Sequence, residues 1–173
     1  TAYRRQRQMC IRDRCMAVWA VLAIGGYALQ SCNTAPVKEV WLDELGQDSC
    51  YVQDWGTVEI NRSVVLTPLT VNGIVYERGL GAHSISRILY DLKSEAVSIS
   101  GLAGADDNNR FAGKLQFKIV GDQKELWKSG VMKKGDPVKE FNVSLKGVDK
   151  VLLLVEECGD GIMYDHADWL NVK

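Results

Sequence analysis

The feature that most constrains the fold is a series of short β-favouring runs, separated by turn residues, that extends from residue 38 to residue 173. In KLQFKIV (114–120) and EFNVSL (140–145), every second side chain is apolar. This period of two gives a strand one buried face and one solvated face. VLLLV (151–155) is continuously apolar, which predicts a central strand buried on both faces. Asn72-Gly73 separates the apolar runs LTV and IVY, a pattern that predicts a tight β-hairpin.

Other runs with β-strand character are KEVWL (38–42), TVEI (57–60), SISRILYDL (84–92), AVSISGLAG (96–104) and ELWKSG (125–130). No segment of this region has the pattern of a helix of ordinary length. About eight short strands at this spacing predict an all-β fold, an antiparallel β-sandwich resembling a jelly roll. The polar loops GADDNNRFAG (104–113) and ECGDGIMYDHAD (157–168) are expected at the ends or edges of the sheets, where ligands usually meet such a scaffold.

The first part of the chain has the pattern of an export signal. Five arginines lie in the first fourteen positions, and the apolar run MAVWAVLAIGGYALQSC (16–32) follows them. That run is too short for a permanent membrane span. Its end, LQSC, resembles a bacterial lipoprotein box, which predicts lipidation of Cys32 and attachment to the bacterial cell envelope through the lipid alone. The alternative is a short buried helix with a chance cysteine.

We therefore divide the chain into four parts. Residues 1–15 form a doubtful leader whose RRQRQMCIRDR stretch is typical of vector or assembly read-through. Residues 16–32 are expected to be a lipoprotein signal peptide, and residues 33–37 a tether. Residues 38–173 are expected to be one domain, a length that suits a single core.

Composition and cysteine content narrow the class further. The formal net charge is -1, with 25% charged and 46% apolar residues, which indicates a packed core and argues against a nucleic-acid partner, because such partners need a basic patch. Beyond Cys32, the cysteines of the predicted domain are Cys50 and Cys158. An oxidising compartment would permit a disulfide between them, but two buried thiols are an equal possibility at this point.

Catalytic and zinc-site patterns are poorly represented in the predicted domain. Its two histidines, His83 and His166, occur without a CxxC or HExxH motif, so a zinc site is not expected. Ser84 directly follows His83, and adjacent strand residues point to opposite faces, which excludes a serine–histidine relay between them. No G-x-S-x-G motif is present.

Four loop aspartates leave two other chemistries open. Asp106 or Asp107 could pair with Asp165 or Asp168 as the two carboxyl groups of a glycoside hydrolase. A small sandwich, however, offers little depth for raising a carboxyl pKa. The same loops supply carboxylate and carbonyl oxygens, which suit a structural Ca²⁺ ion. A solvated acidic loop is the alternative to that ion.

Sugar binding requires an aromatic face for the apolar side of a pyranose and polar groups for its hydroxyls. The predicted domain contains Trp41, Trp55, Trp127 and Trp169. Tryptophan is usually well buried, so core packing is the first expectation for each. Trp55 lies in the turn-like stretch QDWGT and is the best candidate for an exposed sugar platform, whereas Trp169 is expected in the core.

Several of these motifs occur together in one known family. GLGAHSIS (79–86), GADD (104–107), and GDG followed by DHADW (159–169) are its most specific pieces. With VWLDEL, DWGTVEINRSV and KLQFKIVGDQKELWKSG, they make residues 40–173 resemble the NPCBM domain, a carbohydrate-binding module related to the family 51 carbohydrate-binding modules. The resemblance implies a β-sandwich that binds terminal, often galactose-containing glycans, frequently carries Ca²⁺, and is commonly attached to glycoside hydrolases such as α-galactosidase-like enzymes.

The resemblance yields the following expectations. The chain itself is a non-catalytic binding module, and a covalently linked catalytic domain is expected beyond Lys173; a free-standing lipoprotein is the alternative. A protein-interaction or structural lipoprotein domain without sugar binding is the alternative function. Buried hydrogen-bonding roles for His83 and His166 also remain open. The expected carbohydrate-binding residues are Trp55, His83, Asp106, Asp107, Asn108, Arg110 and His166, and the expected calcium ligands are Asp165 and Asp168.

Overall fold

The computed structural model describes residues 36–45, 49–111 and 113–173. These ranges contain one short 3-10 helix and otherwise β-strands. The elements are η1 (Leu42–Glu44), β1 (Ser49–Gln53), β2 (Glu59–Ile60), β3 (Leu69–Val71), β4 (Ile74–Tyr76), β5 (Gly79–His83), β6 (Ser86–Asp91), β7 (Ser98–Ala105), β8 (Leu115–Gly121), β9 (Lys124–Met132), β10 (Lys139–Ser144), β11 (Lys150–Glu157) and β12 (His166–Leu170).

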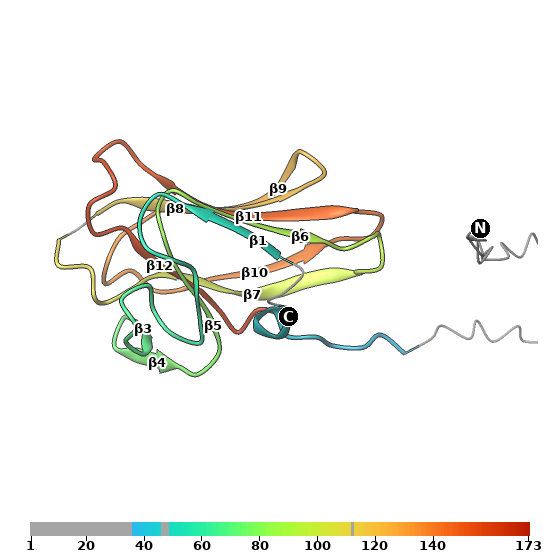
Figure 1. The fold of residues 1–173 in the computed structure, drawn as a ribbon, viewed down its shortest axis with the longest axis horizontal. Coiled ribbons are helices and arrows are strands. Elements are labelled where there is room, and N and C mark those ends of the chain that lie inside the picture. Colours follow the sequence, from blue (N-terminus) through green and yellow to red (C-terminus); the bar gives the residue numbers. More distant parts are fainter. Residues whose placement is uncertain (1–35, 46–48, 112) are drawn as a thin grey trace, which may run out of the picture. The chain divides into compact units, whose positions relative to one another are not determined.

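The strands form two five-stranded sheets and a separate hairpin. The first sheet has the order β1-β6-β11-β8-β9, the second has the order β10-β7-β12-β5-β2, and β3 pairs with β4. Neighbouring strands are antiparallel in each sheet. Figure 1 shows the two sheets packed face to face. The predicted antiparallel β-sandwich is therefore confirmed.

Alternating strands supply the core between the sheets. Leu115, Phe117 and Ile119 of β8 and Phe141 and Val143 of β10 are buried, and the polar residues between them are half-buried or exposed, as the period of two predicts. Trp169 is fully buried and meets Phe117 and Phe141 edge to face, at ring-centroid distances of 5.0 and 5.6 Å. Trp127 packs on the same cluster. Trp169 thus lies in the core, as predicted.

The predicted hairpin forms at Asn72-Gly73, where both residues have positive φ angles, 51° and 77°. Such angles are those of the tight turn that Asn-Gly favours. The β3–β4 hairpin covers the outer side of the second sheet, where Leu69 and Val71 pack with Leu170 of β12. Gly104 of β7 lies directly beneath, because a Cβ there would come within 2.7 Å of the Val71 side chain.

The hairpin determines which strand is buried on both faces. All five residues of β12 are buried, with Trp169 in the main core and Leu170 under the hairpin. In β11, by contrast, Leu152 and Leu154 are only half-buried, whereas Val151, Leu153 and Val155 are buried. The prediction that VLLLV is buried on both sides is therefore wrong for its outward-facing leucines.

The predicted strand KEVWL is also wrong: residues 38–41 are irregular and continue into η1. This segment does not pair with a strand; a backbone hydrogen bond and a cation–π contact connect it to the rest of the domain. The Leu42 N–H donates to the Val172 carbonyl at 2.9 Å, and the Trp41 ring lies beneath the Arg78 guanidinium at 4.7 Å. Arg78 in turn forms ion pairs with Asp43 and Glu44.

Strand register places the two cysteines of the domain far apart. Cys50 of β1 aligns with Leu89 of β6, which aligns with Leu152 of β11. Cys158 lies six positions after Leu152, which is about 20 Å along an extended strand. Because a disulfide requires Cα atoms within about 7 Å, this register excludes a Cys50–Cys158 bridge, and Cys158 is a free thiol.

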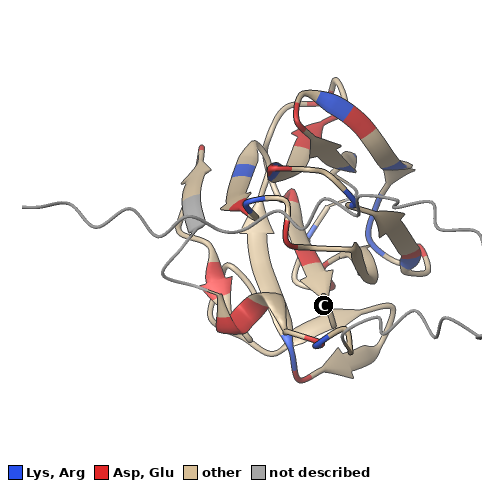
Figure 2. Cartoon of the chain, turned by 90° about the vertical axis from the view of Figure 1, so that its right-hand side faces the viewer, with Lys and Arg blue, Asp and Glu red and all other residues tan. Residues whose placement is uncertain are grey.

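The predicted leader, the predicted signal peptide and Cys32, the predicted lipidation site, lie outside the described residues, as does most of the predicted tether. Among the described residues, no helix has the length and apolar character needed to cross a membrane. In Figure 2 the positions of basic and acidic residues are interspersed along the strands and loops of the ribbon.

Candidate functional site

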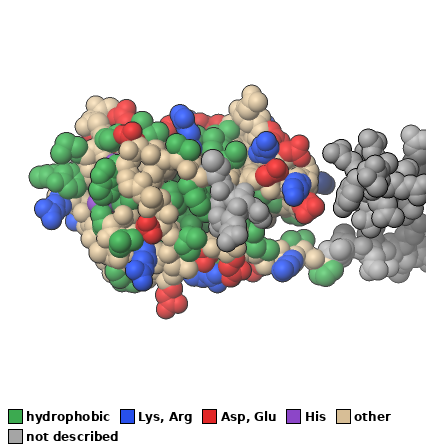
Figure 3. Space-filling view, in the orientation of Figure 1, with side chains coloured by type: hydrophobic (Ala, Val, Ile, Leu, Met, Phe, Trp, Pro, Cys, Tyr) green, Lys and Arg blue, Asp and Glu red, His purple; other side chains and the backbone are tan. Residues whose placement is uncertain are grey.

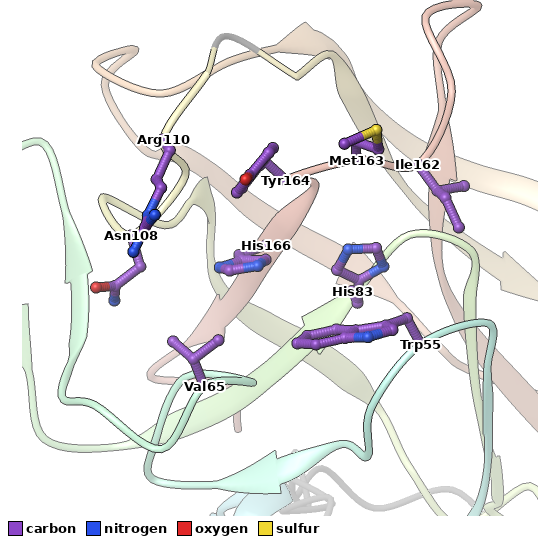
Figure 4. Close-up of a pocket in the computed structure, with 9 residues that line it drawn as sticks. All are labelled: Trp55, Val65, His83, Asn108, Arg110, Ile162, Met163, Tyr164 and His166. Carbon is purple, nitrogen blue, oxygen red and sulfur yellow. The ribbon is translucent and has the colours of Figure 1, made fainter.

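A cavity of about 470 Å³ opens at the end of the sandwich where the two polar loops meet. Five segments that are distant in sequence contribute to it: the loop after β1, the loop before β3, the end of β5, the loop after β7, and the loop before β12 together with the first residue of β12. Figure 4 shows these side chains, and Figure 3 shows a histidine among hydrophobic side chains at this end of the molecule. The lining residues are Trp55, Val65, His83, Asn108, Arg110, Ile162, Met163, Tyr164 and His166.

Three aromatic rings form one wall. Trp55 and His166 are parallel within 2° at a centroid distance of 5.9 Å, and His83 lies 5.2 Å from Trp55 and 5.6 Å from His166. Trp55 remains 49% exposed, as expected for a platform, since a buried ring could not accept a ligand. The structure therefore places Trp55 beside the two histidines with which the sequence grouped it.

Gln53 positions this wall, although no pattern in the sequence marks it as a site residue. Its side-chain amide donates to the Trp55 carbonyl at 2.8 Å, and its carbonyl accepts the His83 N–H at 3.2 Å. One side chain thus connects the loop after β1 to β5. A glutamine two residues before a tryptophan has no recognisable motif, so only the tertiary contact could reveal its role.

The two histidines are neighbours because β5 and β12 pair with His83 opposite His166. Burial lowers the pKa of both imidazoles, so both are neutral at pH 7. The His83 Nδ1 contacts the Ser84 carbonyl oxygen. A carbonyl accepts but cannot donate, so Nδ1 carries the proton and Nε2 is left as an acceptor. An acceptor at this position suits a sugar hydroxyl.

Asn109 fixes the backbone of His166 and was not identified from the sequence. It is fully buried, its amide donates to the His166 carbonyl at 3.0 Å, and its carbonyl accepts the His166 N–H at 2.8 Å. The neighbouring Asn108 does line the cavity. Its amide group donates to Thr67 Oγ1 and to Asp106 Oδ1, each at 2.7 Å. The Asn108 side-chain carbonyl oxygen is therefore left to accept a hydrogen bond, in addition to His83 Nε2.

Asp106 and Asp107 were predicted to contact the sugar, but neither lines the cavity. Asp107 accepts the N–H groups of Asn72 and Gly73 at 3.1 and 2.7 Å and so caps the β3–β4 turn. Asp106 is fully buried and accepts the Asn108 N–H at 2.7 Å. Loop carboxylates satisfy backbone donors well, and here both aspartates build the loops that carry Asn108 and Arg110.

Asp165 and Asp168, the predicted calcium ligands, lie in different surroundings. Asp165 accepts the Ser84 hydroxyl at 2.6 Å. Asp168 is fully buried and lies beside Asp106; burial and then the Asp106 carboxylate raise the pKa of Asp168. Neither Asp168 carboxyl oxygen has a hydrogen-bond partner among the described residues. Within that part of the chain, no three His, Cys, Asp or Glu side chains come together as a metal-ligand group.

The pKa of Asp165 predicts a pH-dependent stability difference. Burial raises this pKa from 3.8 to about 6, which outweighs the opposing hydrogen bond from Ser84. A raised acid pKa means that the folded state binds the proton more tightly than the unfolded state. The wild type should therefore gain stability relative to Asp165→Asn as pH falls from about 6 toward 3.8, and lose it as pH rises through 6.

Urea denaturation of both proteins between pH 4 and pH 8 measures this difference, because Asp165→Asn removes the titration and retains an acceptor for Ser84. Asp136→Asn, at a half-buried loop position, is the control for removing a carboxyl group elsewhere in the domain. A stability difference between wild type and Asp165→Asn that does not change with pH would contradict the prediction.

Comparison with known sequences supplies independent information. Residues 38–173 match the family model of the NPCBM/NEW2 domain. The chain is 30% identical over 152 residues to a "Putative endo-alpha-N-acetylgalactosaminidase" of Renibacterium salmoninarum, covering 84% of this chain and 10% of the relative. It is 29% identical over 124 residues to "Alpha-1,3-galactosidase B" of Akkermansia muciniphila, covering 69% of this chain and 16% of the relative. The chain thus spans less than a fifth of either curated relative.

Solved structures share the fold. A CBM51 from Clostridium perfringens GH95, in complex with methyl-galactose, superimposes with a TM-score of 0.71 at 24% identity over 77% of this chain and 97% of that one. A C. perfringens ZmpB structure that holds the M60 catalytic domain with two CBM51 domains gives a TM-score of 0.71 at 30% identity, over 78% of this chain and 15% of that one. Together with the family match over residues 38–173, these similarities show that the chain belongs to the NPCBM/NEW2 domain family, whose structural neighbours are CBM51 carbohydrate-binding modules.

Proposed function

We propose that residues 38–173 bind a terminal galactose-containing glycan in the cavity beside Trp55. The observation that carries the proposal is the combination of a half-exposed tryptophan with hydrogen-bonding groups at one open cavity. A pyranose needs an apolar surface for its C–H face and acceptors or donors for its hydroxyls. Trp55 offers the surface, and His83 Nε2, the Asn108 carbonyl oxygen and the Arg110 guanidinium offer the polar groups.

Two similarities support galactose as the sugar. One structural neighbour is a complex with methyl-galactose, and one curated relative is named as an alpha-1,3-galactosidase. A single sugar makes few contacts, so we expect a Kd between about one micromolar and one millimolar. Such weak binding is useful when it raises the local concentration of a linked enzyme.

We infer that the domain directs a covalently linked glycoside hydrolase to its glycan. The carbohydrate-binding family supplies no catalytic machinery of its own, and the curated relatives are much longer than this chain. Anchoring through Cys32 in the bacterial cell envelope would hold that enzyme near the cell surface. The support for the anchor is the LQSC sequence after an apolar run.

Isothermal titration of the chain with methyl galactoside, followed by a glycan array, tests the binding proposal. We expect saturable binding of galactosides and weaker binding of methyl glucoside. If neither titration nor array detects a sugar, the proposal fails. Release of nitrophenol from nitrophenyl glycosides by this chain would instead support the hydrolase alternative, and loss of that activity in Asp165→Asn would identify the carboxyl group.

We also propose a structural Ca²⁺ ion at the buried pair Asp106 and Asp168. A fully buried carboxylate with unpartnered oxygens next to a second carboxylate is costly unless it is protonated or bound to a cation. Carboxylates and loop carbonyl oxygens are the ligands that Ca²⁺ prefers. We place Asp106 rather than Asp165 in the site because Asp106 is the carboxylate that lies beside Asp168 and raises its pKa.

Calcium is therefore expected to raise the melting temperature of the chain. A ligand that binds only the folded state at 100 times its Kd adds about 2.7 kcal/mol, which corresponds to an increase of several degrees in Tm. EDTA should reverse the increase, and Asp168→Asn should abolish it. Glu140→Gln, at an exposed position on β10, is the matched control. An equal Tm of the wild type in Ca²⁺ and in EDTA would rule out the site.

A further inference from the structure

Within the described ranges, the cavity is lined by a positively charged side chain that no negatively charged lining side chain balances. Among the described side chains that line it, only Arg110 is charged at pH 7, and none is acidic. His83 and His166 add no charge, because burial lowers the pKa of both imidazoles. A ligand in this cavity therefore meets one cation and no anion.

Arg110 has no ion pair or hydrogen bond among the described residues, although it lies in a loop rich in aspartates. Arg78, by contrast, forms ion pairs with two neighbouring acids, Asp43 at 2.8 Å and Glu44 at 2.5 Å. Figure 4 shows the Arg110 side chain extending beside Asn108 at the cavity wall. Its guanidinium is exposed and available to a ligand.

The acids around the cavity do not compete strongly for Arg110. Asp107 accepts two backbone N–H groups of the hairpin turn, and Asp160 accepts that of Lys114. Asp106 is buried against Asn108. Asp165 is held by Ser84. Asp54, whose charge reaches His83, is exposed beside Trp55 but does not line the cavity.

We propose that the glycan recognised at this site bears an oxyanion, a carboxylate or a sulfate ester, that pairs with Arg110. The proposal rests on the carbohydrate-binding function and specifies its ligand class. A guanidinium presents parallel N–H donors that match two oxygens of a carboxylate or sulfate, and such charge-assisted pairs are stronger than hydrogen bonds to a neutral hydroxyl. Trp55, His83 and Asn108 would hold the sugar ring while Arg110 selects its charged substituent.

The test compares three ligands by isothermal titration at low salt: methyl galactoside, galactose 6-sulfate and methyl galacturonoside. At least one charged sugar should bind about tenfold more tightly than methyl galactoside. The two charged ligands distinguish a sulfate from a carboxylate. Raising NaCl from about 20 to 500 mM should reduce this ratio, because the added ions screen an exposed pair. Sodium sulfate alone, titrated as a control, should not bind measurably at the same concentrations.

Arg110→Gln should bring the ratio of charged to neutral affinity close to one, and Arg110→Lys should retain part of it. Arg87→Gln, at an exposed position of β6 in the first sheet, is the matched control and should keep the wild-type ratio. Equal binding of all three sugars by the wild type would overturn this inference and leave the carbohydrate-binding function intact. Binding of none of them would overturn both. An unchanged ratio in Arg110→Gln would show that another group selects the charge.

Discussion

Replacing Trp169 by alanine is expected to lower the free energy of unfolding by about 3–5 kcal/mol, the cost typical of emptying a large aromatic site in a core. Trp169 has no exposed surface and contacts Phe117, Phe141 and Trp127 between the two sheets. These aromatic side chains cannot collapse into the space, because they are fixed by their own strands. A small domain is stable by about 5–15 kcal/mol in total, so this one substitution removes a large share.

Urea denaturation followed by far-UV circular dichroism measures the loss without relying on the deleted fluorophore. Trp169→Phe is the graded control and should cost less than alanine, since it retains a ring against Phe117. Calcium should be held at one fixed concentration, because Asp168 is the neighbouring residue. A loss of no more than about 0.5 kcal/mol for Trp169→Ala, the range of surface substitutions, would show that Trp169 does not organise the core.

Replacing Trp55 by alanine is expected to have the opposite profile, with binding lost and stability retained. Trp55 is 49% exposed, so its removal should change the free energy of unfolding by no more than about 1 kcal/mol. The sugar would lose its apolar platform and the side chain stacked on His166. We expect the Kd for methyl galactoside to rise at least about tenfold, equivalent to about 1.4 kcal/mol.

Trp41→Ala is the matched control for Trp55→Ala. Trp41 is also partly exposed, but it packs under Arg78 and does not line the cavity. Its substitution should leave galactoside affinity unchanged under conditions where the protein stays folded. If Trp55→Ala binds methyl galactoside as tightly as the wild type does, the ligand does not use this platform and the cavity is not the sugar site.

Trp55 and Trp169 show that the same residue type can be half-exposed at a cavity or fully buried in the core. Both were candidates for a platform by composition, and both belong to motifs of the family. Trp55 follows a strand in a turn, where its ring cannot enter the core, whereas Trp169 is in the middle of β12 and points between the sheets. Local context in the sequence was sufficient to separate them, because a turn and a strand expose their side chains differently.

The sequence did not distinguish the roles of the four aspartates that were predicted to bind sugar or calcium. Asp106, Asp107, Asp165 and Asp168 are chemically identical, and the sequence places all four in its two polar loops, although Asp168 belongs to β12 in the structure. The roles of Asp107 and Asp165 depend on partners that are distant in sequence, with Asn72 at 35 positions from Asp107 and Ser84 at 81 positions from Asp165. Sequence proximity suggested that Asp165 and Asp168 act together. The pairing of Asp168 with Asp106 instead follows from β12 lying next to β7 in the second sheet.

The sequence by itself determined the fold class, the Asn72-Gly73 hairpin and the inward faces of β8 and β10. These follow from period-two alternation and turn chemistry, which act over a few residues. Only the tertiary structure decided that β12 is buried on both faces, that Leu152 and Leu154 are not, and that Gln53 and Asn109 position the cavity. Those features depend on which layer covers which sheet and on side chains that meet across distant loops, and no local pattern records such contacts.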